Sequence, residues 1–169
     1  MNNRRFQTLD KNYQSKLMDS FPKLSAIINN ENKHDYQQVA ITVFDHWLTE
    51  DEAVKELNDV PIEKQKIYDA KLHSFVCGLT STFESYLIKC VGRHKERVTF
   101  RAFKSDDARR TLVPLNYFAS HRHRFIFVVP ALQLIYTESW DYTHHVYLRD
   151  SASLEVLRAE AAKVGVYVL

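Results

Sequence analysis

The chain has 169 residues, and its 23 Lys and Arg residues against 21 Asp and Glu residues give a formal net charge of +2. It has 3 glycines, Gly78, Gly92 and Gly165, and their wide separation excludes dinucleotide fingerprints, phosphate-binding loops and nucleophile elbows, which need closely spaced glycines. With 26% charged and 45% hydrophobic residues the composition is that of a globular protein, and we expect a single domain over residues 1–169.

The two cysteines and the lengths of the apolar runs indicate the cellular compartment of the protein. If one helix carries Cys77 and Cys90, they lie roughly 20 Å apart at about 1.5 Å per residue, too far for a disulfide. The first residues lack the apolar stretch of a signal peptide, and no apolar run approaches about 18 residues. We therefore predict a cytoplasmic protein with reduced thiols, no membrane association and no cofactor.

In chain order, the first predicted elements are helices. Leu9 to Phe21 has helical spacing and is interrupted at Pro22. From Tyr36 to Trp47 apolar residues recur at spacings of three and four, which predicts a second helix. Thr49 and Glu52 form a capping-box pattern and predict a short helix that ends before Pro61.

The stretch from Pro61 to Val91 is predicted as one long central helix. Its apolar positions are Tyr68, Leu72, Phe75, Leu79, Phe83, Tyr86 and Cys90. The opposite face carries small residues, namely Ser74, Gly78, Ser81 and Ser85. A solvated polar face explains this stripe, and a close packing contact, including a homodimer interface, is the alternative.

Beyond Gly92 the apolar period changes to two. The segments 97–102, 112–115, 125–129, 132–136 and 142–148 read as strands, followed by a helix near 151–164 that Gly165 ends and a short strand at 166–169. The predicted fold is therefore α+β, with a helical portion, 1–91, packed on a mainly antiparallel sheet of about five or six strands from a sheet portion, 92–169.

Positive charge is concentrated in residues 89–124, which hold ten basic and three acidic side chains. This pattern suits nucleic-acid phosphates or an acidic protein partner. Pairing with acidic groups of the helical portion explains it equally well. The candidate binding residues are Arg93, Lys95, Arg97, Arg101, Lys104, Arg109 and Arg110.

Histidines and aromatic residues form the second group of candidates. His121 and His123 share a face of an extended chain, and with His144 or His145 and Asp141 they could bind a metal or transfer protons. From this set we select His121, His123, His144 and Asp141, although isolated histidines are the simpler explanation. Trp140 and Tyr142 are of residue types enriched at binding hot spots.

The functional prediction is a non-catalytic protein that binds a macromolecule through the basic segment and the Trp140 region. A protein partner is preferred, as in small accessory proteins of the immunity or counter-defence type. The alternative is nucleic-acid binding, or a nuclease that depends on a histidine.

Overall fold

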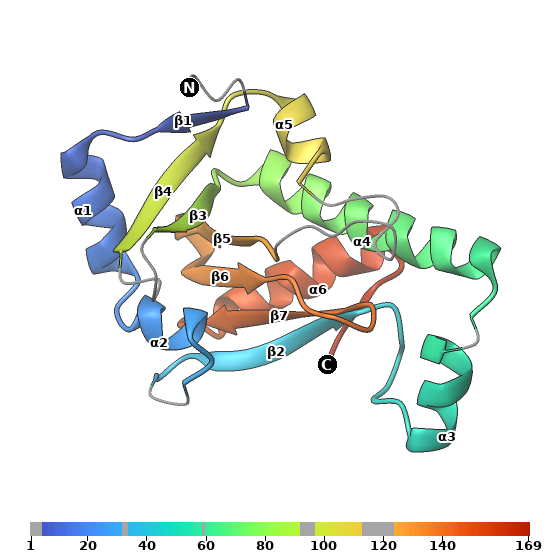
Figure 1. Ribbon diagram of the computed structural model, residues 1–169. Coiled ribbons are helices and arrows are strands. Elements are labelled where there is room, and N and C mark those ends of the chain that lie inside the picture. The colour runs from blue at the N-terminus through green and yellow to red at the C-terminus, as the bar shows by residue number, and fades with distance from the viewer. Residues whose placement is uncertain (1–4, 32–33, 59, 92–96, 113–123) are drawn as a thin grey trace.

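The computed structural model describes residues 5–31, 34–58, 60–91, 97–112 and 124–169 (Figure 1). Within these ranges an eight-stranded antiparallel sheet runs in the order β1-β4-β3-β5-β6-β7-β2-β8. The strands are β1 (Phe6–Thr8), β2 (Gln37–Thr42), β3 (Tyr86–Val91), β4 (Arg97–Phe103), β5 (Ile126–Val129), β6 (Leu134–Thr137), β7 (Thr143–Leu148) and β8 (Tyr167–Val168). The α+β class is confirmed, and the expected five or six strands are too few.

The helices cover both faces of the sheet. They are α1 (Lys11–Ser20), α2 (Leu24–Ile28), α3 (Glu50–Ala53), α4 (Ile62–Thr82), α5 (Asp106–Arg110) and α6 (Ala152–Val164), with a π-helical turn η1 (Val54–Asn58) and a 3-10 turn η3 (Pro130–Leu132). Figure 1 shows α1 and α2 at the left and α4 extending to the right, with α3 set apart from the sheet at the lower right.

Two apolar cores follow from this layering. Alternate residues of β5 point to opposite faces, so Phe127 belongs to the core under α4 and α6, whereas Val128 belongs to the core under α1 and α2. Both residues are fully buried. The sheet is thus covered on two sides, and its central strands are apolar on both.

The segment predicted as a helix from Tyr36 to Trp47 contains a strand, β2, paired with β7 and β8. Val39, Ala40 and Ile41 are all buried, because both faces of this strand are covered. A strand buried on both faces has no polar alternation, so its apolar residues fall by chance at helical spacings. Strands inside residues 1–91 also correct the expected helical portion.

The long helix is shorter than predicted. α4 ends at Thr82, and Phe83 caps it with an extended backbone at φ -119° and ψ 140°. β3 follows from Tyr86, so the Tyr86 and Cys90 positions belong to a strand. Ser85 is buried and lies outside the helix, which removes it from the predicted small-residue stripe.

Several local predictions are confirmed. Thr49 and Glu52 form a reciprocal capping box at the start of α3. Gly165 ends α6 in the left-handed conformation at φ 70°, where glycine avoids the Cβ penalty. In the described part of the chain, no helix has the length and apolar character required to cross a membrane.

Candidate functional site

The loop between β6 and β7 places Trp140 on the surface. The indole is 61% exposed, although large aromatic side chains are usually covered. Asp141 and Tyr142 have φ values of 61° and 54°, and the backbone N–H of Thr143 donates to the carbonyl of Trp140 at 3.0 Å. A left-handed backbone is costly for a tyrosine, and such strain persists only where surrounding contacts hold it.

Tyr142 supplies that support from inside the protein. It is 4% exposed, and its ring packs edge-on against the ring of Tyr68 with 5.0 Å between centroids. Burial raises the pKa of Tyr142 to about 12, and the charge of Asp69 adds to this shift. Tyr142, expected as a partner contact, therefore anchors the loop that presents Trp140.

A second exposed tryptophan, Trp47, lines the same cavity as Trp140. The cavity has a volume of about 290 Å³, and Trp47 is 63% exposed. We call it the tryptophan cleft; its walls include Phe44, His46, Trp47, Leu57, Trp140 and Asp141. The two tryptophans are the only ones in the chain, and the fold brings them together from distant parts of the sequence.

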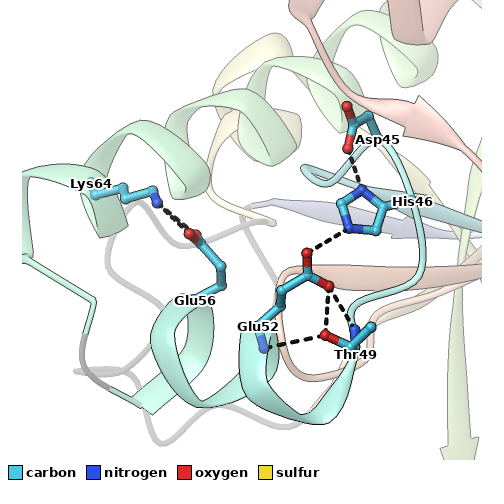
Figure 2. A network of polar contacts seen from close by, with 6 residues as sticks. All are labelled: Asp45, His46, Thr49, Glu52, Glu56 and Lys64. Carbon is cyan, nitrogen blue, oxygen red and sulfur yellow. Dashed lines mark hydrogen bonds and ion pairs between the residues drawn. The ribbon is translucent and has the colours of Figure 1, made fainter.

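Polar contacts hold the segment that carries Trp47 (Figure 2). The His46 ring lies between two carboxylates, with Nδ1 at 2.5 Å from Asp45 and Nε2 at 3.3 Å from Glu52. Glu52 also accepts from the backbone N–H of Thr49 at 2.9 Å, which ties the chain on either side of Trp47 to the first turn of α3.

These contacts shift the pKa values of both partners. Hydrogen bonds to Asp45 and then to Glu52 raise the pKa of His46, because the carboxylates favour the imidazolium form. The backbone N–H of Thr49, followed by its hydroxyl and His46, lowers the pKa of Glu52 to about 2. Both side chains face solvent, so the network sets geometry more than stability.

Tyr68 of α4 joins the two walls of the cleft. Its hydroxyl donates to Glu56 of η1 at 2.7 Å, and Lys64 binds the same carboxylate at 2.6 Å. The Tyr68 ring also contacts Phe44, at 5.5 Å between centroids, in addition to Tyr142. The Trp47 wall and the Trp140 loop are thus anchored to a single buried residue of α4.

The segment that follows Trp47 and contains α3 is acidic. Residues 45–58 carry five acidic side chains and one basic side chain. Glu50 and Asp51 are exposed in the first turn of α3, and Asp141 lines the cleft. Exposed carboxylates therefore lie close to Trp47 along the chain.

On the other side of Trp140 the charge is positive. The Arg124 guanidinium stacks over the indole at 4.1 Å from the ring centroid, a cation–π geometry. The loop base beneath it is fixed by Glu138, which accepts from the backbone N–H of Phe125 at 3.2 Å and is buried. A second and larger cavity opens there and shares Ser139, Trp140 and His145 with the tryptophan cleft.

The adjacent histidines point to opposite faces of β7. His144 is 3% exposed and hydrogen-bonded to the Tyr136 hydroxyl at 2.6 Å, and burial lowers its pKa to about 3. His145 faces both cavities. Strand alternation predicts that one of the pair is buried, but which one depends on the sheet register.

The other predicted histidines, His121 and His123, lie outside the described residues, as do Arg93 and Lys95. Within the described ranges, no group of three His, Cys, Asp or Glu side chains is arranged to hold a metal ion. His144 is buried against Tyr136, whereas Asp141 is exposed in the loop between β6 and β7.

The described basic residues differ in whether the fold engages their side chains. Arg97 and Arg101 lie on one face of β4 on either side of Thr99, whose register partner on β3 is Lys89. Lys104 and Arg110 are exposed. Arg109 is engaged in the fold, since it donates to the carbonyl of Thr80 at 2.9 Å and pairs with Asp106 at 2.8 Å.

The remaining helix stripe is open. Ser74 and Ser81 are exposed, and a Cβ added at Gly78 would meet no described atom within 4 Å. Close packing against this glycine is therefore not seen in the described part of the chain.

Comparison with known proteins found no family model, no curated protein and no solved structure that matches this chain.

Proposed function

We propose that this chain is a protein-binding protein, and that the tryptophan cleft captures a partner segment with an apolar or aromatic anchor next to basic residues. The observation that carries the proposal is the convergence of Trp47 and Trp140 on one cavity, with each indole more than half exposed. Tryptophan is among the residues most enriched at binding hot spots, where an anchor from the partner fills a pocket.

The charge near the cleft supports a basic partner segment. The exposed carboxylates of Glu50 and Asp51, close to Trp47 in the sequence, attract basic groups and repel phosphates, so a nucleic acid would be disfavoured there. A basic protein segment fits both features, because its anchor enters between the tryptophans while its Lys or Arg side chains face Glu50 and Asp51 of α3.

Selection from a random peptide library displayed on phage tests this function. We expect the selected peptides to share an aromatic or large aliphatic anchor beside Lys or Arg. Trp47→Ala and Trp140→Ala should each weaken the binding of a selected peptide by about thirtyfold, the loss typical of a hot spot. Tyr167→Ala is the matched control, because Tyr167 is an aromatic residue 44% exposed on β8 that does not line the cleft.

Two results would contradict the proposal. One is a selected peptide that binds the Trp47→Ala, Trp140→Ala double variant as tightly as the unmodified protein. The other is a set of peptides without basic residues whose affinity does not change in the Glu50→Lys, Asp51→Lys variant.

A second candidate function, nucleic-acid binding, is favoured by the alignment of Arg97 and Arg101 on one face of β4, with Lys89 on the adjacent strand. Binding of labelled single-stranded oligonucleotides should then fall steeply with salt and fall further in the Arg97→Glu, Arg101→Glu variant. Absence of binding at low salt would exclude this candidate.

A further inference from the structure

The second cavity, which we call the Arg124 cavity, has a volume of about 720 Å³, in the range of small-molecule sites. Its floor is the face of the sheet toward α2, formed by Ile88 of β3, Ile126 of β5 and Tyr147 of β7, with Ile28 of α2 as a wall. The floor is apolar, because Ile88, Tyr147 and Ile28 belong to the core under α1 and α2.

The hydrogen-bond donors that line this cavity beside its apolar floor include Arg124 and His145, and Lys89 adds a second cation. Arg124 is exposed, and among the described residues its guanidinium contacts the face of Trp140 and forms no ion pair. An unpaired guanidinium beside an apolar cavity suits an anionic group, to which it can donate two parallel hydrogen bonds.

His145 supplies the second donor. The Gln38 amide nitrogen lies 3.3 Å from Nδ1 of His145. The contact with Gln38 engages Nδ1, so Nε2 is the ring nitrogen left for a ligand. Burial, followed by the charge of Arg124, lowers the pKa of His145, so the ring is a neutral donor at pH 7.

We propose that the Arg124 cavity binds a small organic anion, a carboxylate or sulfonate attached to a flat apolar body. The anionic group pairs with Arg124 and accepts from His145, and the apolar body lies on Ile88 and Ile126 beside Trp140. This site is separate from the proposed protein-binding function. Its ligand is a small organic anion, whereas the tryptophan cleft is proposed to bind a basic protein segment.

A matched pair of fluorescent probes tests the charge requirement. The probes are 1-anilinonaphthalene-8-sulfonate and N-phenyl-1-naphthylamine, which share the apolar body and differ by the sulfonate. We expect the sulfonate to bind about tenfold more tightly, and Arg124→Gln to remove that difference. Arg149→Gln is the control, since Arg149 also lies over an aromatic ring, 6.0 Å from the centroid of Tyr36, but does not line the cavity.

The two cysteines locate the probe. Cys90 lines the Arg124 cavity, whereas Cys77 belongs to α4 on the other side of the sheet. With the sulfonate at about ten times its Kd, alkylation of Cys90 by N-ethylmaleimide should slow by about tenfold, following the unoccupied fraction. The rate at Cys77, measured by mass spectrometry in the same sample, should stay unchanged.

Three results would overturn the site. They are equal affinity for both probes, a sulfonate affinity that Arg124→Gln leaves unchanged, and protection of both cysteines or of neither. Near-UV circular dichroism of each variant shows that its tertiary structure is intact, so a loss of binding cannot be attributed to unfolding.

Discussion

Replacing Tyr142 tests how the protein holds Trp140 at its surface. Truncation to alanine removes a buried aromatic ring that covers about 150–250 Å². At about 25 cal/mol per Å², this burial corresponds to roughly 4–6 kcal/mol as an upper limit, and aromatic-to-alanine changes in cores cost about 3–5 kcal/mol. Because the ring is 4% exposed and packs on Tyr68, we expect Tyr142→Ala to lower the free energy of unfolding by about 4 kcal/mol.

At residue 142 we expect glycine and alanine to rank in stability in the opposite order from the usual one. Glycine normally destabilises relative to alanine by about 0.5–1 kcal/mol, because it gains more entropy on unfolding. At φ 54° an alanine Cβ costs about 1–2 kcal/mol that glycine avoids. Tyr142→Gly should therefore be at least as stable as Tyr142→Ala.

Urea unfolding followed by far-UV circular dichroism measures both variants, with the slope of the unfolding free energy against urea as a check on two-state behaviour. A loss below about 1 kcal/mol in Tyr142→Ala would show that the ring is not part of the core. A glycine variant about 1 kcal/mol less stable than the alanine variant would refute the left-handed backbone.

Further predictions concern the glycines and the histidine network. Gly78→Ala should raise the free energy of unfolding by about 0.5–1 kcal/mol, because a Cβ there meets no described atom. Gly165→Ala, at φ 70°, should lower it by about 1 kcal/mol. The two variants should therefore shift the midpoint of urea unfolding in opposite directions. His46 has a raised pKa, so its contacts stabilise the fold fully below pH 6.5, the ordinary value, and are lost as the pH rises through the raised pKa. Glu52, whose pKa is lowered to about 2, contributes above its ordinary value of 4.5, and this contribution is lost as the pH falls toward 2. In an NMR titration of the His46 ring, Asp45→Asn should lower the pKa more than Glu52→Gln, and an equal or reversed order would contradict the geometry.

Short-range sequence patterns predict the elements whose ends carry helix-capping residues. The capping box at Thr49 and the left-handed Gly165 are determined by short-range chemistry, so their residues were identifiable without the fold. The same holds for β5, whose continuous apolar run predicts a strand buried on both faces.

Long-range pairing determined the elements that sequence analysis misassigned. β2 is a strand because β7 and β8 flank it, and its apolar residues alone also fit a helix. The end of α4 at Thr82 carries no glycine or proline, and β3 continues the apolar spacing past it. Tertiary contacts override such local patterns.

The sequence predicts one wall of the tryptophan cleft and misses the other. Trp140 was selected for its residue type and proves exposed at a cavity. Trp47 was assigned to the apolar face of a helix, because the segment around it had helical spacing. Tyr68 had the signal of a core residue only, and its role as the shared anchor of both walls depends on contacts with Tyr142 and Glu56 that no spacing reveals.

The most direct test of the tryptophan cleft uses fluorine NMR on protein labelled with 5-fluorotryptophan. With two tryptophans in the chain, the spectrum has two resonances, which Trp47→Phe assigns. Titration with a peptide selected by phage display should shift both resonances, with the same Kd for Trp47 and Trp140. Saturating peptide that leaves both resonances in place would show that binding occurs elsewhere and would contradict the proposed function.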